Sequence, residues 1–118
     1  MAMQCSMTPQ SQARLLLAQE MFYASFNDKA AAMLASADAK ATTMCDHLLI
    51  GREARAKSTA LASDQSRAFF EVSDAAYTKA EEAAQSLEDV RELAQEAVLN
   101  QRRSAAGKLF DRAKALMN

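Results

Sequence analysis

The sequence predicts an all-α protein of three or four helices, a bundle or helical hairpin dominated by one long coiled-coil-like helix. Of its 118 residues, 27 are alanine, the residue that most favours helix. Two glycines and one proline are too few for the regular turns of an all-β domain. With 50% hydrophobic residues and a net charge of -1, the composition also excludes a disordered chain.

A chain of this length suits one domain. We expect a flexible N-terminal tail over residues 1–8 and a single helical domain over residues 9–118. Thr8 and Pro9 together form a helix-start signal, because threonine caps free N–H groups and proline is tolerated at the first helical position. The first helix then extends to about Phe26, and Asn27-Asp28 is the candidate break.

The second predicted helix runs from about Asp28 to Leu49, with apolar residues spaced three and four apart. Gly51 follows it and is the best candidate for a turn in the whole chain, although a helix can pass through one glycine at a cost of about 1 kcal/mol.

The third predicted helix runs from about Ser63 to Gln101 without a glycine or proline. Its apolar seam repeats at intervals of three and four residues, which is typical of a coiled coil. The residues from Ser104 to Met117 either extend this helix or fold back, with a hinge near Asn100-Gln101 or at Gly107. We expect the seam and the residue beside it to form a helix–helix interface: Phe69, Phe70, Val72, Ala76, Ala80, Ala83, Leu87, Val90, Ala94 and Ala97.

The larger apolar residues gather over residues 15–26 and 69–77, and we expect these two clusters to meet in the core. Charge changes sign along the chain: residues 64–96 hold 9 acids and 3 bases, and residues 101–114 hold 5 bases and 1 acid. The basic cluster either complements the helix dipole and the acidic stretch or contacts an acidic partner. The candidate contacts for such a partner are Arg102, Arg103, Lys108 and Arg112.

The sequence contains no catalytic, cofactor or metal motif, so we expect no enzyme. His47, the single histidine, is interpreted as a polar residue at the edge of a helical face rather than as a general base or a pH-sensitive contact. Without a secretory signal, Cys5 and Cys45 are interpreted as free thiols of a cytoplasmic protein. No segment is long and apolar enough to span a membrane, and the balanced charge does not favour nucleic-acid binding.

Two segments each resemble half of a tetratricopeptide repeat. One carries Leu17, Ala18 and Met21 followed by Ala30, Leu34 and Ala37, and the other carries Leu93, Ala94 and Ala97 followed by Ala106, Phe110 and Ala113. The offset between the two matches is no multiple of the period of such repeats, so they predict no regular array.

The predicted function is a non-catalytic structural, scaffold or adaptor role, exerted through helix–helix contacts in a homo-oligomer or with another helical protein. One alternative is an amphipathic coat protein on a lipid or polymer surface. Another is a small secreted helical-hairpin protein, because the chain length and Tyr77-x-x-x-Glu81 are similar to the hairpin proteins that type VII systems secrete.

Overall fold

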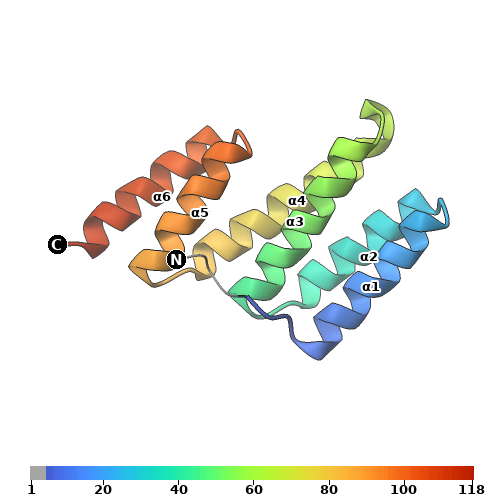
Figure 1. Cartoon of the computed structure of the whole chain (residues 1–118), viewed down its shortest axis with the longest axis horizontal. Coiled ribbons are helices and arrows are strands. Elements are labelled where there is room, and N and C mark those ends of the chain that lie inside the picture. The colour runs from blue at the N-terminus through green and yellow to red at the C-terminus, as the bar shows by residue number, and fades with distance from the viewer. Residues whose placement is uncertain (1–4) are drawn as a thin grey trace. The chain divides into compact units, whose positions relative to one another are not determined.

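A computed structural model describes residues 5–118 and contains six α-helices, with no strand among those residues. The prediction of an all-α protein is confirmed. The helix pairs α1–α2, α3–α4 and α5–α6 each form an antiparallel hairpin (Figure 1). The helices are α1 Pro9–Tyr23, α2 Asn27–Lys40, α3 Met44–Ala60, α4 Ser63–Ala83, α5 Leu87–Leu99 and α6 Arg103–Leu116.

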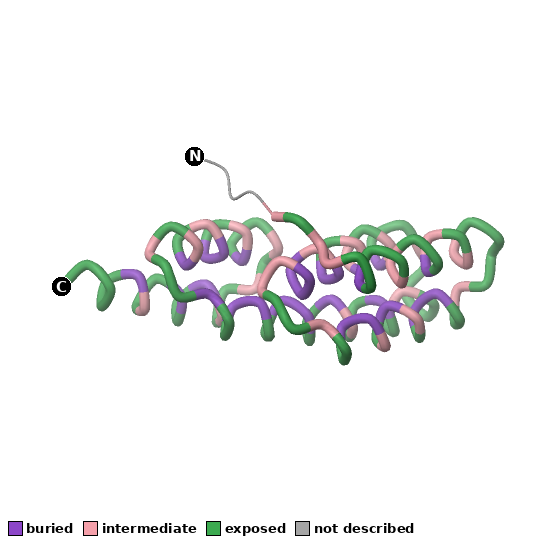
Figure 2. Tube along the Cα trace, turned by 90° about the horizontal axis from the view of Figure 1, so that it is seen from below, coloured by how far each residue is buried: buried purple, intermediate pink, exposed green. Residues whose placement is uncertain are grey.

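The described residues divide into two compact units, Cys5–Ala80 and Glu81–Asn118. In the first unit, α1 packs on α2, and α2 packs on α3. In the second unit, α5 packs on α6. Buried and exposed residues alternate along the helices (Figure 2), as expected for helices that each bury one face.

The prediction of one helix from Ser63 to Gln101 is wrong, because the chain breaks between α4 and α5 at residues 84–86. The Ser86 hydroxyl accepts the Asp89 N–H at 3.1 Å and thereby caps α5. The Arg112 guanidinium of α6 donates to the backbone carbonyl oxygens of Glu81, at 2.6 Å, and of Ala84. Carbonyl groups at a helix end need partners outside the helix, and a side chain distant in sequence supplies one here.

The second predicted helix is also two helices, separated at residues 41–43. Thr43 begins α3 by accepting the Asp46 N–H on its hydroxyl at 3.0 Å. The prediction of a turn at Gly51 is wrong, since Gly51 lies inside α3. A Cβ there would approach the Tyr77 ring to 3.3 Å and the Ala76 Cβ to 3.4 Å, so glycine allows α3 and α4 to pack closely.

The α1–α2 and α5–α6 hairpins share one turn geometry. Ser25 and Gln101 both adopt a positive φ, 69° and 61°. After each, an N–H bonds back into the preceding helix: Phe26 to the Met21 carbonyl and Arg102 to the Ala97 carbonyl, both at 2.8 Å. The break predicted at Asn27-Asp28 therefore lies slightly earlier, and the hinge near Asn100-Gln101 is confirmed.

Gln101→Gly is expected to raise the free energy of unfolding by about 0.5–1 kcal/mol, because glycine adopts a positive φ without the steric cost of a side chain. Urea unfolding of the full chain measures this change. Gln95→Gly, at an exposed position inside α5, is the matched control and should lower stability by about 1 kcal/mol. Equal losses in both variants would contradict the role assigned to the turn.

The two apolar clusters expected from the sequence do meet in the Cys5–Ala80 unit. The Phe22 and Phe69 rings contact edge to face, with centroids 5.8 Å apart. Around them, buried Ala18, Ile50 and Ala76 belong to one hydrophobic cluster. The prediction that residues 15–26 and 69–77 form a common core is therefore confirmed only in part, because five large apolar residues of these segments are exposed: Leu16, Leu17, Tyr23, Phe26 and Phe70.

The hairpins repeat a common pattern of small residues. In each hairpin, the first helix carries one small buried residue and the second helix carries another. These pairs are Ala18 with Ala30, Gly51 with Ser73, and Ala94 with Ala106. The spacing within a pair is the same in the two outer hairpins and longer in the middle hairpin. The two similar segments found in the sequence lie in the outer hairpins. Because the middle hairpin between them is longer, they are not separated by a whole number of repeat periods.

Candidate protein-interaction surface

The last helix, α6, has one buried face and one open face. Ala106, Leu109 and Ala113 are buried. Along another side of the helix, ending at its C-cap, four exposed residues form what we term the open stripe: Gly107, Phe110, Lys114 and Met117. They follow one another at intervals of three and four residues, so they lie along a single line of the helix surface.

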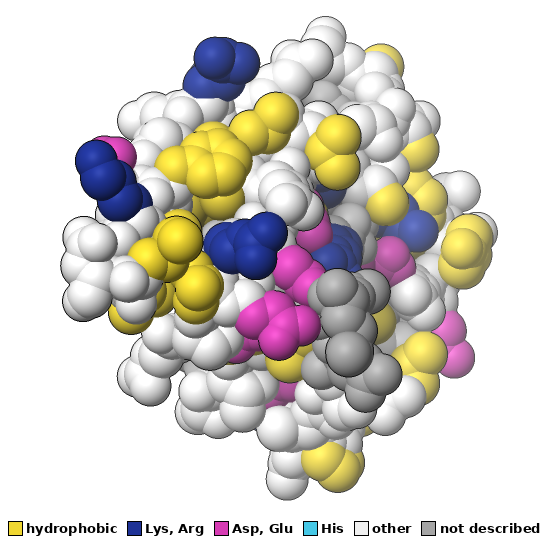
Figure 3. Space-filling model, turned by 60° about the vertical axis from the view of Figure 1, so that its left-hand side comes forward, with side chains coloured by type: hydrophobic (Ala, Val, Ile, Leu, Met, Phe, Trp, Pro, Cys, Tyr) yellow, Lys and Arg dark blue, Asp and Glu magenta, His cyan; other side chains and the backbone are white. Residues whose placement is uncertain are grey.

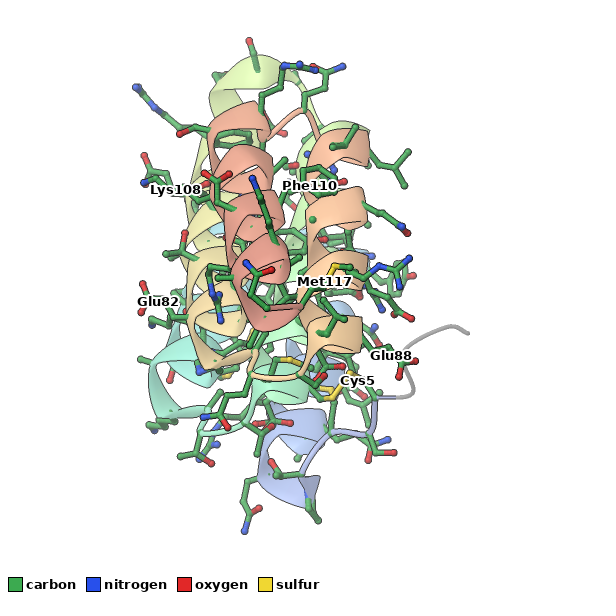
Figure 4. All side chains as sticks on the ribbon, turned by 90° about the vertical axis from the view of Figure 1, so that its left-hand side faces the viewer. Cys5, Glu82, Glu88, Lys108, Phe110 and Met117 are labelled. Carbon is green, nitrogen blue, oxygen red and sulfur yellow. A yellow bond between two sulfur atoms is a disulfide. The ribbon has the colours of Figure 1, made fainter. Side chains whose placement is uncertain are left out.

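Figure 4 shows Phe110 and Met117 on one side of α6 and Lys108 on the other. Phe110 is 48% exposed and Met117 is 71% exposed. A Cβ placed on Gly107 would meet no atom within 4 Å, so the stripe is uncovered there as well. On the face that Figure 3 presents, exposed hydrophobic side chains lie beside Lys and Arg side chains.

Because the two outer hairpins have the same internal spacing, each residue of the open stripe on α6 corresponds to a residue of α2. We term these α2 residues the covered stripe. Ala31, Leu34 and Asp38 of this stripe are buried, and Ala41 at the C-cap is half-buried. Leu34, the counterpart of Phe110, is 1% exposed. It belongs to a hydrophobic cluster with residues of α3, and α2 packs on α3. The positions that are buried on α2 are thus open on α6.

Asp38 in the covered stripe carries a charge and is itself buried, so it needs partners. One carboxylate oxygen lies 2.7 Å from His47 Nδ1 of α3, and the other accepts a hydrogen bond from Lys79 Nζ at 2.9 Å. His47 is buried. The position interpreted from the sequence as the polar edge of a helical face therefore forms a polar contact between α2 and α3.

The ten residues expected to form a helix–helix interface divide into buried and exposed positions. Phe69, Ala76, Ala80, Val90, Ala94 and Ala97 are buried within the chain. Val72 and Leu87 are half-buried, whereas Phe70 and Ala83 are exposed. Because the helix breaks after Ala83, these residues belong to two helices and do not form one continuous seam.

The four basic residues expected to contact an acidic partner also divide. Arg102 pairs with the Glu81 carboxylate, and Arg112 binds the end of α4, so both are engaged within the chain. Arg103 and Lys108 are exposed. Lys114, in the open stripe, is a further exposed base that the sequence placed in the same basic cluster.

A disulfide and several hydrogen bonds connect residues 5–8 to the beginning of α3. Cys5 and Cys45 form a disulfide with their Cα atoms 5.2 Å apart, so the prediction of two free thiols is wrong for this structure. Next to it, the Asp46 carboxylate accepts hydrogen bonds from the Thr8 N–H at 2.9 Å, the Thr8 hydroxyl at 2.8 Å and the Ser11 hydroxyl at 2.9 Å. Residues 1–4 of the expected tail lie outside the described residues.

Asp46 has no exposed surface. Burial raises the pKa of its carboxyl, but the hydrogen bonds from Thr8, with those from Ser11 and Thr43, outweigh burial and hold the pKa below its ordinary value. The anion therefore joins the N-terminal segment, α1 and α3.

A shallow groove of about 570 Å³ lies between α2 and α4, lined mainly by alanines of both helices. The charged residues Asp28, Asp38, Glu71 and Lys79 also line it. Asp38 and Lys79 already neutralise each other, so their pairing points to no ligand for this groove.

Within residues 5–118, no group of three or more His, Cys, Asp or Glu side chains is arranged to hold a metal ion. No helix in the same range is long and apolar enough to cross a membrane. Comparisons with protein-family models, with curated proteins and with solved structures find no match to this chain.

Proposed function

We propose that this protein is a non-catalytic adaptor or scaffold that binds a helix of a partner protein along the open stripe of α6. The observation that carries the proposal is the pair of corresponding stripes. In α2, Leu34 is buried in a cluster with residues of α3, and Asp38 contacts His47 of α3 and Lys79 of α4. In α6, the same positions expose Phe110 and Met117. Apolar side chains of this size, aligned on one helix face, favour burial against a second helix.

A partner helix is a better match to the stripe than α1 of a second copy. In the chain, α3 covers α2 and places His47 against Asp38. The position of α1 that corresponds to His47 is Arg14, because α1 and α3 are aligned by their small residues Ala18 and Gly51. Stacking α6 on α1 of another copy would bring Arg14 against Lys114, and two like charges in contact oppose association. Self-association, which the sequence suggested, stays a prediction for other surfaces.

A peptide with the sequence of α3 tests the proposal directly. The probe is a labelled peptide of residues 43–60, carrying C45A to prevent disulfide exchange and H47Q to remove the titratable ring. We expect this peptide to bind the full chain, with an anisotropy change that saturates. Phe110→Glu should weaken binding by about tenfold or more, because the substitution places a charge in the apolar contact.

Phe70→Glu is the matched control, because Phe70 is also an exposed aromatic residue but lies on α4. It should leave peptide binding unchanged. No binding to the wild-type chain, or equal weakening by both substitutions, would contradict the proposed function. Circular dichroism of both variants checks that the helical fold is retained.

A further inference from the structure

The covered stripe of α2 and the open stripe of α6 differ in charge at one position. The charged member of the covered stripe is Asp38, whose carboxylate faces His47 of α3 at 2.7 Å. The corresponding member of the open stripe is Lys114, which is exposed. The position one turn earlier keeps its large apolar character, since Leu34 corresponds to Phe110.

This reversal of charge, from Asp38 to Lys114, changes which side chain a helix packed on the stripe must provide. A charged group buried at a helix–helix contact requires an opposite charge or hydrogen-bond partner, because desolvation without one is costly. At Asp38, α3 supplies an imidazole nitrogen and α4 supplies the Lys79 ammonium. Over Lys114, a basic group would leave the ammonium without an acceptor, whereas a carboxylate would accept its hydrogen bond and neutralise its charge.

The charges around Lys114 on α6 are mixed. Asp111, three residues before it, is exposed and is the one acid of that helix. Arg103 and Lys108 are also exposed, but Lys108 lies on the other side of α6 from the open stripe, and Arg103 is roughly 16 Å from Lys114 along the helix. The preference for an acidic helix therefore rests on Lys114 itself.

We propose that Lys114 selects its partner, by requiring a carboxylate at the position of the docking helix that corresponds to His47 in α3. The partner is an amphipathic helix with Asp or Glu at this position, a large apolar residue three positions later and a small residue seven positions later. These are the places of Ile50 and Ala54 on α3. This inference rests on the proposed function, and its test separates the two.

The experiment compares two probe peptides of residues 43–60 that differ at a single position, H47E and H47Q, both carrying C45A. Each is titrated against the wild-type full chain and against Lys114→Gln. A carboxylate near a helix N-terminus also stabilises the peptide helix by itself, so the preference on the wild-type chain must be measured relative to Lys114→Gln. Circular dichroism checks that the variant retains its helical fold.

We expect the wild-type chain to bind the H47E peptide about tenfold more tightly than the H47Q peptide, and Lys114→Gln to reduce this ratio severalfold. The ratio should also fall as salt is raised. An H47K peptide should prefer Lys114→Glu to the wild-type chain, which reverses the selection.

An equal ratio on the wild-type chain and on Lys114→Gln would overturn the selection by Lys114. If the H47Q peptide still bound and still depended on Phe110, the proposed function would survive that result. Loss of all peptide binding would instead contradict the proposed function itself.

Discussion

Asp46→Ala is expected to lower the free energy of unfolding by roughly 3–5 kcal/mol, because it removes the shared acceptor of a buried network. The Thr8 N–H, the Thr8 hydroxyl and the Ser11 hydroxyl all donate to this carboxylate. Ser11 is buried, so its hydroxyl would be left without that acceptor. Denaturant unfolding followed by circular dichroism measures the loss.

Asp46→Asn removes the charge of the side chain but keeps its shape. The folded-state pKa of Asp46 lies below its unfolded value, so its contribution is present above the unfolded pKa, near pH 4. That contribution is lost as the pH falls through the folded-state pKa. Asp46→Asn should therefore lower stability at pH 7 and flatten the acid limb of the stability curve.

Asp111→Asn is the control for acid sensitivity, because Asp111 is an exposed acid on α6. This variant should follow the wild-type acid limb closely. If Asp46→Asn lost stability below pH 4 as steeply as the wild-type chain, the assignment of acid sensitivity to Asp46 would be wrong.

Reduction of the Cys5–Cys45 disulfide is expected to lower the free energy of unfolding by roughly 4 kcal/mol, because opening the closed loop enlarges the unfolded ensemble. The two cysteines have a sequence separation of 40, so the loop is long. Thermal unfolding of the full chain with and without dithiothreitol measures the effect. The native fold should persist at low temperature, because the Asp46 network holds the same segment independently.

Cys5→Ser distinguishes the disulfide from general effects of the reductant. It should unfold at the temperature of the reduced wild-type chain and show no further change with dithiothreitol. An unchanged wild-type unfolding temperature in dithiothreitol would show that the bond does not stabilise the native state.

Local signals in the sequence found the helix beginnings and the hinge better than the helix lengths. The Thr8-Pro9 signal marks the beginning of α1, where the Thr8 hydroxyl lies at the cap. The long third helix was mispredicted because Ser86 gives a weak signal inside an alanine-rich stretch. Its capping role became evident only together with Arg112, which binds the end of α4 from another helix.

The open stripe was missed because periodicity cannot tell which apolar face remains uncovered. Leu34 and Phe110 occupy equivalent positions of equivalent hairpins, yet one is buried and the other half-exposed. The similarity of the two segments in the outer hairpins indicated this equivalence, but the longer middle hairpin makes the spacing between them irregular. Lys114 belonged to the basic cluster, without an indication that it lies beside exposed apolar residues.

By itself, the sequence determined the helical class, the position of the first cap and the two segments that meet in the core, because these depend on propensity and on spacing along the chain. It did not determine which side chains of those segments are buried, since Leu16, Leu17 and Phe70 are exposed. Tertiary structure alone decided where the long helices break, that Gly51 packs inside a helix, and that Cys5 meets Cys45. It also decided which of two similar stripes is covered. These features depend on contacts between residues distant in sequence, whose geometry no local pattern contains.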